Sequence, residues 1–109
     1  MKKFKKFLAV ASVAAMTLSL CACGGKKDDT YTVGICQLVQ HEALDAATKG
    51  FKDALIEEFG EDGIKFDEQN AQGDANTCAT IINGFVSSDV DLILANATPA
   101  LQAAAAGTD

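Results

Sequence analysis

The sequence predicts an α/β fold in which a parallel three-stranded sheet lies between layers of helices. Short runs of apolar and β-branched residues alternate with longer segments whose apolar residues recur at spacings of three and four. The connections between these segments are short, which suits right-handed crossovers between parallel strands. We therefore predict a three-layer βαβαβα order over residues 31–109.

The first strand is predicted at residues 31–39, YTVGICQLV, because β-branched and apolar side chains dominate this run. A helix is predicted over residues 41–59, ending at Gly60. Its apolar stripe consists of Leu44, Ala47, Phe51, Leu55 and Phe59.

Four acidic residues lie at the end of this helix and just after it: Glu57, Glu58, Glu61 and Asp62. We interpret them as a solvated face, because no apolar segment nearby in the sequence would raise a carboxyl pKa. The alternative is a pair of catalytic carboxylates.

Residues 64–71, IKFDEQNA, are polar and alternate weakly, which predicts an edge strand. Gly73 and Asp74 then turn the chain and cap a second helix over residues 75–87. Two cysteines, Cys36 in the first strand and Cys78 in this helix, are interpreted as buried free thiols. The alternative, a disulfide between them, needs a Cβ geometry that strand and helix positions seldom offer.

The third strand is predicted at residues 90–95, VDLILA, whose apolar run is typical of a strand buried on both faces. Asn96 ends the run. Pro99, the only proline, precedes a series of alanines and a leucine, which are strong helix formers. This pattern predicts that Thr98 is the N-cap of a third helix and that Pro99 is its first residue.

The first 22 residues have the organisation of a signal peptide, with four lysines in residues 1–6 and an apolar run over residues 7–20. In LCACGG, Leu20 stands three residues before Cys23 and Ala22 directly before it, which resembles the lipobox of bacterial lipoproteins. The resemblance implies cleavage after residue 22, acyl chains such as palmitate on Cys23, and a flexible tether over residues 23–30.

A lipoprotein of this kind is exported and held at the outer face of the cytoplasmic membrane, which is the periplasmic side in a Gram-negative cell. The alternatives for Cys21 and Cys23 are a metal site or a disulfide, but no second pair of ligands lies nearby in the sequence.

Removal of residues 1–22 leaves five lysines against all fifteen acidic residues, a net charge of −10, and the chain has no arginine. Without a basic patch, nucleic acid is excluded as an expected partner. Anionic lipid would repel this chain, so the acyl chains would have to hold it at the bilayer.

The sequence offers no catalytic or cofactor motif. The segment CQLVQHE after the first strand contains no glycine, so it cannot wrap a pyrophosphate. GxSxG, HExxH and paired CxxC motifs are absent, and the one histidine, His41, has no partner that the sequence identifies. We therefore expect a binding protein rather than an enzyme, with no cofactor and no metal.

Polar residues lie at the end of each of the three predicted strands, and they are the candidate ligand-binding residues: Gln37, His41, Asn70, Asn96 and Thr98. Amide and hydroxyl groups donate and accept hydrogen bonds, which suits a small zwitterion or a sugar. The carboxyl ends of parallel strands meet at one edge of a sheet, so we expect one site. The alternative is that these side chains only cap helices and satisfy turn backbone.

Three segments of residues 31–109 carry a resemblance to a known family: VGICQLVQHEALDAATKGFKDAL, QNAQGDANT and VDLILANATPALQAAA. They resemble the amino-terminal lobe of ABC-transporter substrate-binding lipoproteins, a family with tryptophan- and tyrosine-binding members. The resemblance implies a Rossmann-like lobe of a two-lobe, type I periplasmic-binding-protein-like fold. It places the five candidate residues at the cleft between the lobes. Two residues depart from the family pattern: Glu42, where proline is usual, and Glu68, where a less polar residue is usual.

The resemblance implies a solute receptor that binds an aromatic amino acid and delivers it to the membrane permease of an ABC importer. Family members are much longer than this chain, so we expect residues 31–109 to be an incomplete amino-terminal lobe. Two other functions stay open: a sensing or structural lipoprotein that uses the same lobe, and an exported α/β enzyme.

Overall fold

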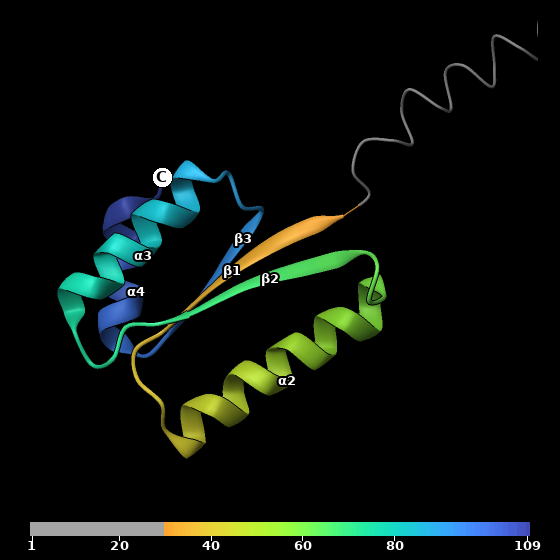
Figure 1. The fold of residues 1–109 in the computed structure, drawn as a ribbon, viewed down its shortest axis with the longest axis horizontal. Coiled ribbons are helices and arrows are strands. Elements are labelled where there is room, and N and C mark those ends of the chain that lie inside the picture. Colours follow the sequence, from red (N-terminus) through yellow and green to blue (C-terminus); the bar gives the residue numbers. More distant parts are fainter. Residues whose placement is uncertain (1–29) are drawn as a thin grey trace, which may run out of the picture.

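The computed structural model describes residues 30–109 and contains six elements in the predicted order (Figure 1). The strands are β1 (Tyr31–Gln37), β2 (Ile64–Asn70) and β3 (Leu92–Asn96). The helices are α2 (Glu42–Phe59), α3 (Ala75–Ser87) and α4 (Thr98–Gly107). The signal peptide, Cys23 and nearly all of the tether lie outside the described residues. The predicted α/β fold class is confirmed.

The three strands form one parallel sheet in the order β2-β1-β3, so β2 is an edge strand as predicted. The strands end in register, because Gln37 pairs with Asn70 on one side and with Asn96 on the other. The last residues of all three strands therefore form a row across the carboxyl edge of the sheet.

Helix α2 covers one face of the sheet, and α3 and α4 cover the other (Figure 1). On the α2 side, Val33 and Ile35 pack against Phe51 and Leu55. The opposite core contains Cys36, Cys78, Ile81, Ile82, Phe85 and Ala100. This arrangement confirms the three layers.

The face that α2 turns toward the sheet includes Phe51 and Leu55 of the predicted stripe but differs from it at other positions. Ala47 is exposed, whereas Thr48 is buried and Ile56 packs with the core on this side. The stripe prediction is therefore wrong at Ala47, in whose place the hydroxyl of Thr48 faces the strand ends, and at Phe59, which is 45% exposed at the end of the helix.

Two strand boundaries differ from prediction by two residues, and the ends of β2 and β3 differ by one. β1 ends at Gln37 rather than at residue 39, because the chain bends at Leu38 and Val39. β3 begins at Leu92, because the Asp91 carboxylate accepts a hydrogen bond from the Thr32 N–H at 2.8 Å. Burial of this strand on both faces is wrong for its first residue, since Leu92 is 49% exposed.

Cys36 and Cys78 are both fully buried, as predicted, and both are free thiols in the structure. Burial raises the pKa of the Cys36 thiol to about 12, and the neighbouring Cys78 contributes to the same shift. The Cys36 thiol is therefore neutral in the folded protein across the physiological pH range.

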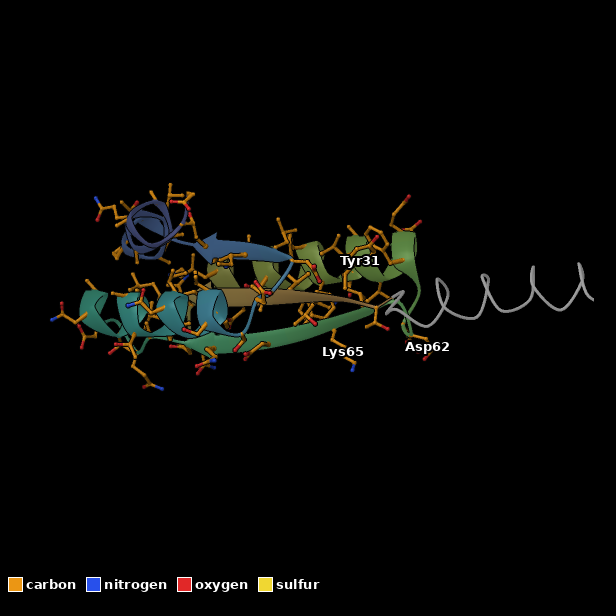
Figure 2. All side chains as sticks on the ribbon, turned by 90° about the horizontal axis from the view of Figure 1, so that it is seen from above. Tyr31, Asp62 and Lys65 are labelled. Carbon is orange, nitrogen blue, oxygen red and sulfur yellow. The ribbon has the colours of Figure 1, made fainter. Side chains whose placement is uncertain are left out.

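The amino end of the sheet exposes acidic residues together with the apolar side chains of Tyr31, Phe59 and Leu92. The acidic residues at the end of α2 are all exposed, which agrees with a solvated face. Figure 2 shows Asp62 and Lys65 at this end, close to where Tyr31 begins β1. Among the helices that the structure describes, none combines the length and apolar character needed to cross a bilayer.

Gly34 allows α3 to pack closely on β1. A Cβ atom at residue 34 would lie 2.6 Å from ring carbons of Phe85, which is 1% exposed. We expect Gly34→Ala to lower the free energy of unfolding by about 1 to 3 kcal/mol, because the methyl group would displace this ring. Urea denaturation measures the change.

Gly50→Ala is the matched control, because a Cβ at this position of α2 meets no atom within 4 Å. Alanine has the better helix propensity, so this variant is expected to gain about 1 kcal/mol. If both variants changed stability in the same direction, the close contact between Gly34 and Phe85 would be contradicted.

Candidate functional site

The candidate site lies at the carboxyl edge of the sheet, where Asn70, Gln37 and Asn96 form the row defined by the strand register. Residues aligned in this way present their side chains to the same face of a parallel sheet. Gln37 and Asn96 are buried beneath α2, whereas Asn70 on the outer strand is exposed. All three strand ends thus meet at one edge.

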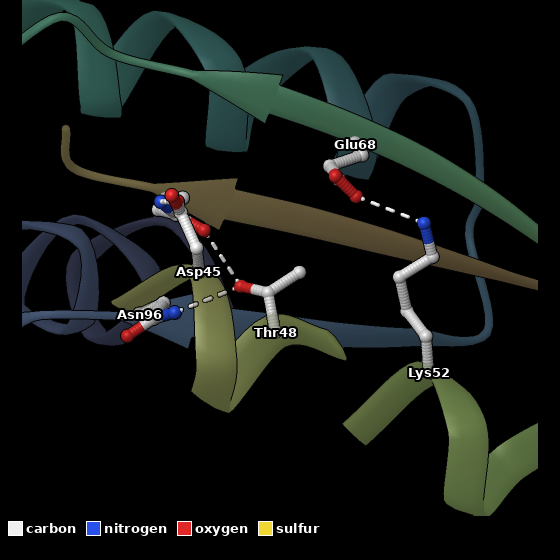
Figure 3. A network of polar contacts seen from close by, with 6 residues as sticks. Asp45, Thr48, Lys52, Glu68 and Asn96 are labelled. Atoms are coloured by element: carbon white, nitrogen blue, oxygen red, sulfur yellow. Dashed lines mark hydrogen bonds and ion pairs between the residues drawn. The ribbon is translucent and has the colours of Figure 1, made fainter. Parts of the chain in front are cut away.

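Thr48 on α2 joins the ends of β1 and β3 (Figure 3). Its hydroxyl donates to Gln37 Oε1 at 2.7 Å and accepts from Asn96 Nδ2 at 2.8 Å. Asn96 Nδ2 also donates to the Leu44 carbonyl at 2.9 Å. These bonds tie the second turn of α2 to two strands that are far apart in the sequence.

The amide nitrogen of Gln37 also forms hydrogen bonds. Gln37 Nε2 donates to Asp45 Oδ1 at 2.6 Å and to the Val39 carbonyl at 2.9 Å. The first contact reaches α2 and the second fixes the corner that follows β1. Within residues 30–109, every buried side-chain nitrogen and oxygen has a hydrogen-bond partner.

His41 and Asn70 make the local contacts that the alternative interpretation expects. His41 is the N-cap of α2, and its Nδ1 accepts from the Ala43 N–H at 3.1 Å. Asn70 Oδ1 accepts from the Gln72 N–H at 2.8 Å and so stabilises the turn after β2. Both side chains are exposed. His41 Nε2 and Asn70 Nδ2 take no part in these bonds.

The predicted N-cap of α4 is wrong by one residue. Ala97 is the N-cap, Thr98 is the first helical residue and Pro99 is the second. The helix starts earlier because the Ala97 carbonyl already accepts the hydrogen bond from the Leu101 N–H, at 3.0 Å. The Thr98 hydroxyl consequently makes no capping hydrogen bond.

Ala97 adopts a backbone conformation that is nearly restricted to glycine, with φ 101° and ψ 160°. A residue with a side chain pays about 1 to 3 kcal/mol for such a conformation, and these residues concentrate at ligand sites. Sequence reasoning missed Ala97, because nothing in its side chain indicates a positive φ.

A hollow of about 260 Å³ opens at the ends of β1 and β2, and Gln37 and Asn70 both line it. It adjoins a groove of about 400 Å³ between α2 and β2. Lys52 and Glu68 form an ion pair across that groove, at 3.0 Å, which gives the polar residue at position 68 a partner. His41, Asn96 and Thr98 belong to the same edge of the sheet but line neither hollow.

The arrangement offers amide, hydroxyl and imidazole groups together with the amino ends of α2 and α4. The first backbone N–H groups of a helix lack intrahelical acceptors, and the helix dipole favours a negative group there. In residues 30–109, histidine, cysteine and acidic side chains form no group of three or more that could hold a metal ion. The site is therefore suited to a small polar ligand with a carboxylate.

Comparison with known proteins identifies a family and solved structures with a similar fold. A family model described as ABC transporter substrate binding protein matches residues 32–109. A tyrosine-binding protein of Clostridioides difficile (strain R20291) is 51% identical over 74 residues, which are 66% of this chain and 21% of that protein.

Two solved structures are also similar. One is the ligand-free, open structure of a substrate binding protein with adhesive properties from Clostridium difficile, with 46% identity and a TM-score of 0.68. The other is an ABC domain from Streptococcus pneumonia in complex with L-Trp, with 38% identity and a TM-score of 0.68. The matches cover 72% of this chain and 28% and 27% of those chains. The chain thus spans about a fifth of its curated relative and under a third of the solved chains.

The strain at Ala97 can be tested by removing its Cβ. We expect Ala97→Gly to raise the free energy of unfolding by about 1 kcal/mol, because relief of the strain exceeds the entropy that glycine adds to the unfolded chain. Thermal or urea denaturation measures the change.

Ala79→Gly in the exposed part of α3 serves as the control and is expected to lose about 1 kcal/mol, the ordinary cost of glycine in a helix. A comparable loss in Ala97→Gly would contradict the unusual conformation of this corner.

Proposed function

Because the chain belongs to the family of ABC transporter substrate-binding proteins, we propose that the complete gene product is the solute receptor of an ABC importer and binds an aromatic amino acid. The family is the one that the sequence motifs indicate. In this proposal the protein binds its ligand without catalysis and delivers it to a permease in the membrane.

The observation that carries the proposal is the row of strand ends at the carboxyl edge of the sheet. Gln37, Asn70 and Asn96 end their strands in register, and the two corners beside them lead into α2 and α4. A helix amino terminus favours the carboxylate of an amino acid, and amide oxygens can accept from its ammonium group. This edge therefore has groups for both charged ends of a zwitterion.

The aromatic side chain of the ligand is inferred from the relatives. One relative is named a tyrosine-binding protein, and one similar structure contains L-Trp. Both are well above the identity at which only a fold is shared, at 51% and 38%. An aromatic amino acid is accordingly the ligand class to test first.

We also propose that acylated Cys23 holds the protein at the outer face of the cytoplasmic membrane. β1 begins at Tyr31, so residue 30, the first described residue, lies at the amino end of the sheet. The candidate site occupies the carboxyl end, and an anchor at the other end would leave it open to solute (Figure 1).

Thr98 provides the first test of the ligand site. In the complete gene product, Thr98→Ala is expected to weaken binding of L-tyrosine or L-tryptophan by about 1 to 2 kcal/mol. Since the hydroxyl makes no capping bond, the melting temperature without ligand should change little. Isothermal titration calorimetry and thermal denaturation measure the two quantities.

Thr80→Ala on the exposed side of α3 is the matched control and should change neither quantity appreciably. A fall in the stability of the ligand-free Thr98→Ala protein with unchanged affinity would remove Thr98 from the ligand site.

The anchor is tested by cell fractionation with palmitate labelling. Cys23→Ala is expected to release the protein from membranes and abolish the label, because the acylated side chain is lost. Cys21→Ala should retain both. A Cys23→Ala protein that stays in the membrane fraction and carries the label would show that the anchor lies elsewhere.

A further inference from the structure

Thr48 stands out as a buried hydroxyl on the face of α2 that packs against the sheet. It is 4% exposed, and Phe51 and Leu55 on the same face pack in the core of that side. A hydroxyl in such a place destabilises the fold unless its hydrogen-bonding capacity is used. Here both the proton and a lone pair of the hydroxyl are used, by Gln37 and Asn96.

These contacts determine which way the Asn96 amide faces. A carbonyl oxygen can only accept, so the group that faces the Leu44 carbonyl must be the NH₂ of Asn96. The single proton of the Thr48 hydroxyl goes to Gln37 Oε1, so the hydroxyl accepts the second proton of that NH₂. Both amide protons of Asn96 are therefore held inside the protein.

The carbonyl oxygen of the same amide, Asn96 Oδ1, takes no part in these hydrogen bonds. No hydrogen bond reaches it within residues 30–109, and no unpartnered side-chain oxygen in this part of the chain is fully buried. Asn96 Oδ1 is thus an acceptor without a hydrogen bond that is not fully buried, on a residue that is 9% exposed, and Thr48 and Leu44 fix its orientation. It lies at the end of β3, directly before the strained corner at Ala97.

We propose that Thr48 is a positioning residue of the binding site, which holds the Asn96 amide so that Oδ1 accepts a hydrogen bond from the ammonium group of the ligand. The inference rests on the proposed function, because it assigns one contact within that site. Gln37 has a different role in the site, because both the nitrogen and the oxygen of its amide already form hydrogen bonds, with Asp45 and Val39 and with Thr48. Gln37 therefore acts through Thr48.

The test compares Thr48→Val with Thr48→Ser in the complete gene product by calorimetry with L-tryptophan and L-tyrosine. Valine has the shape of threonine without the hydroxyl, so the Asn96 amide loses one of its two anchors. We expect Kd to rise about tenfold or more in Thr48→Val and to stay within about threefold in Thr48→Ser. Should Thr48→Val fail to fold, Thr48→Ala replaces it with the same expectation.

A second ligand separates positioning from general loss of structure. Indole-3-propionate is L-tryptophan without its amino group, so it cannot donate to Asn96 Oδ1. We expect Thr48→Val to lower the ratio of the affinity for L-tryptophan to the affinity for this analogue by about fivefold or more. Competition binding measures this ratio. A loss of structure alone would weaken both ligands equally.

Ile82→Val is the control for lost stability, because Ile82 is buried in the core on the other side of the sheet. It should lower the melting temperature and leave Kd unchanged. If the unaltered protein binds an aromatic amino acid and Thr48→Val keeps its Kd, the positioning role is overturned and the proposed function stands. If the unaltered protein binds neither amino acid, the proposed function is overturned and this inference with it.

Discussion

The hydrogen-bonded chain from Asn96 through Thr48 to Gln37 is the interaction on which the carboxyl edge of the sheet depends. It joins β1 and β3 to α2 at the carboxyl ends of the two strands, where polar corners follow. Since it is buried, loss of any member would leave partners unsatisfied in a medium of low dielectric constant. The same bonds that stabilise the edge also set the directions of its amides.

The two sides of the sheet differ in the polarity of their cores. The side covered by α3 and α4 is apolar throughout and contains two free thiols and the close contact between Gly34 and Phe85. The side covered by α2 is apolar only in its middle, and its carboxyl end is polar. A ligand site at that end can therefore vary in its side chains without disturbing the larger part of the core.

The sequence predicted the elements and the edge to which they lead, because hydrophobic periodicity and the turn residues are local signals. Asp74 as an N-cap and Ile64–Asn70 as an edge strand are examples. Thr48 escaped prediction because a polar side chain gives no hydrophobic signal that it lies on the sheet-facing side of α2. Ala97 escaped because its positive φ opposes the preference of alanine, and only the tertiary structure imposes it. The residues that sequence reasoning missed are thus those whose burial or backbone conformation depends on the tertiary structure.

Hydrogen–deuterium exchange of the complete gene product, with and without L-tyrosine or L-tryptophan, tests whether the carboxyl edge of the sheet binds the ligand. We predict slower exchange on binding for the backbone amides of residues 38–41 and 97–101. We predict no change for residues 60–64 and 88–91 at the opposite end of the sheet. Protection at that opposite end, with the carboxyl corners unchanged, would contradict binding at the carboxyl edge.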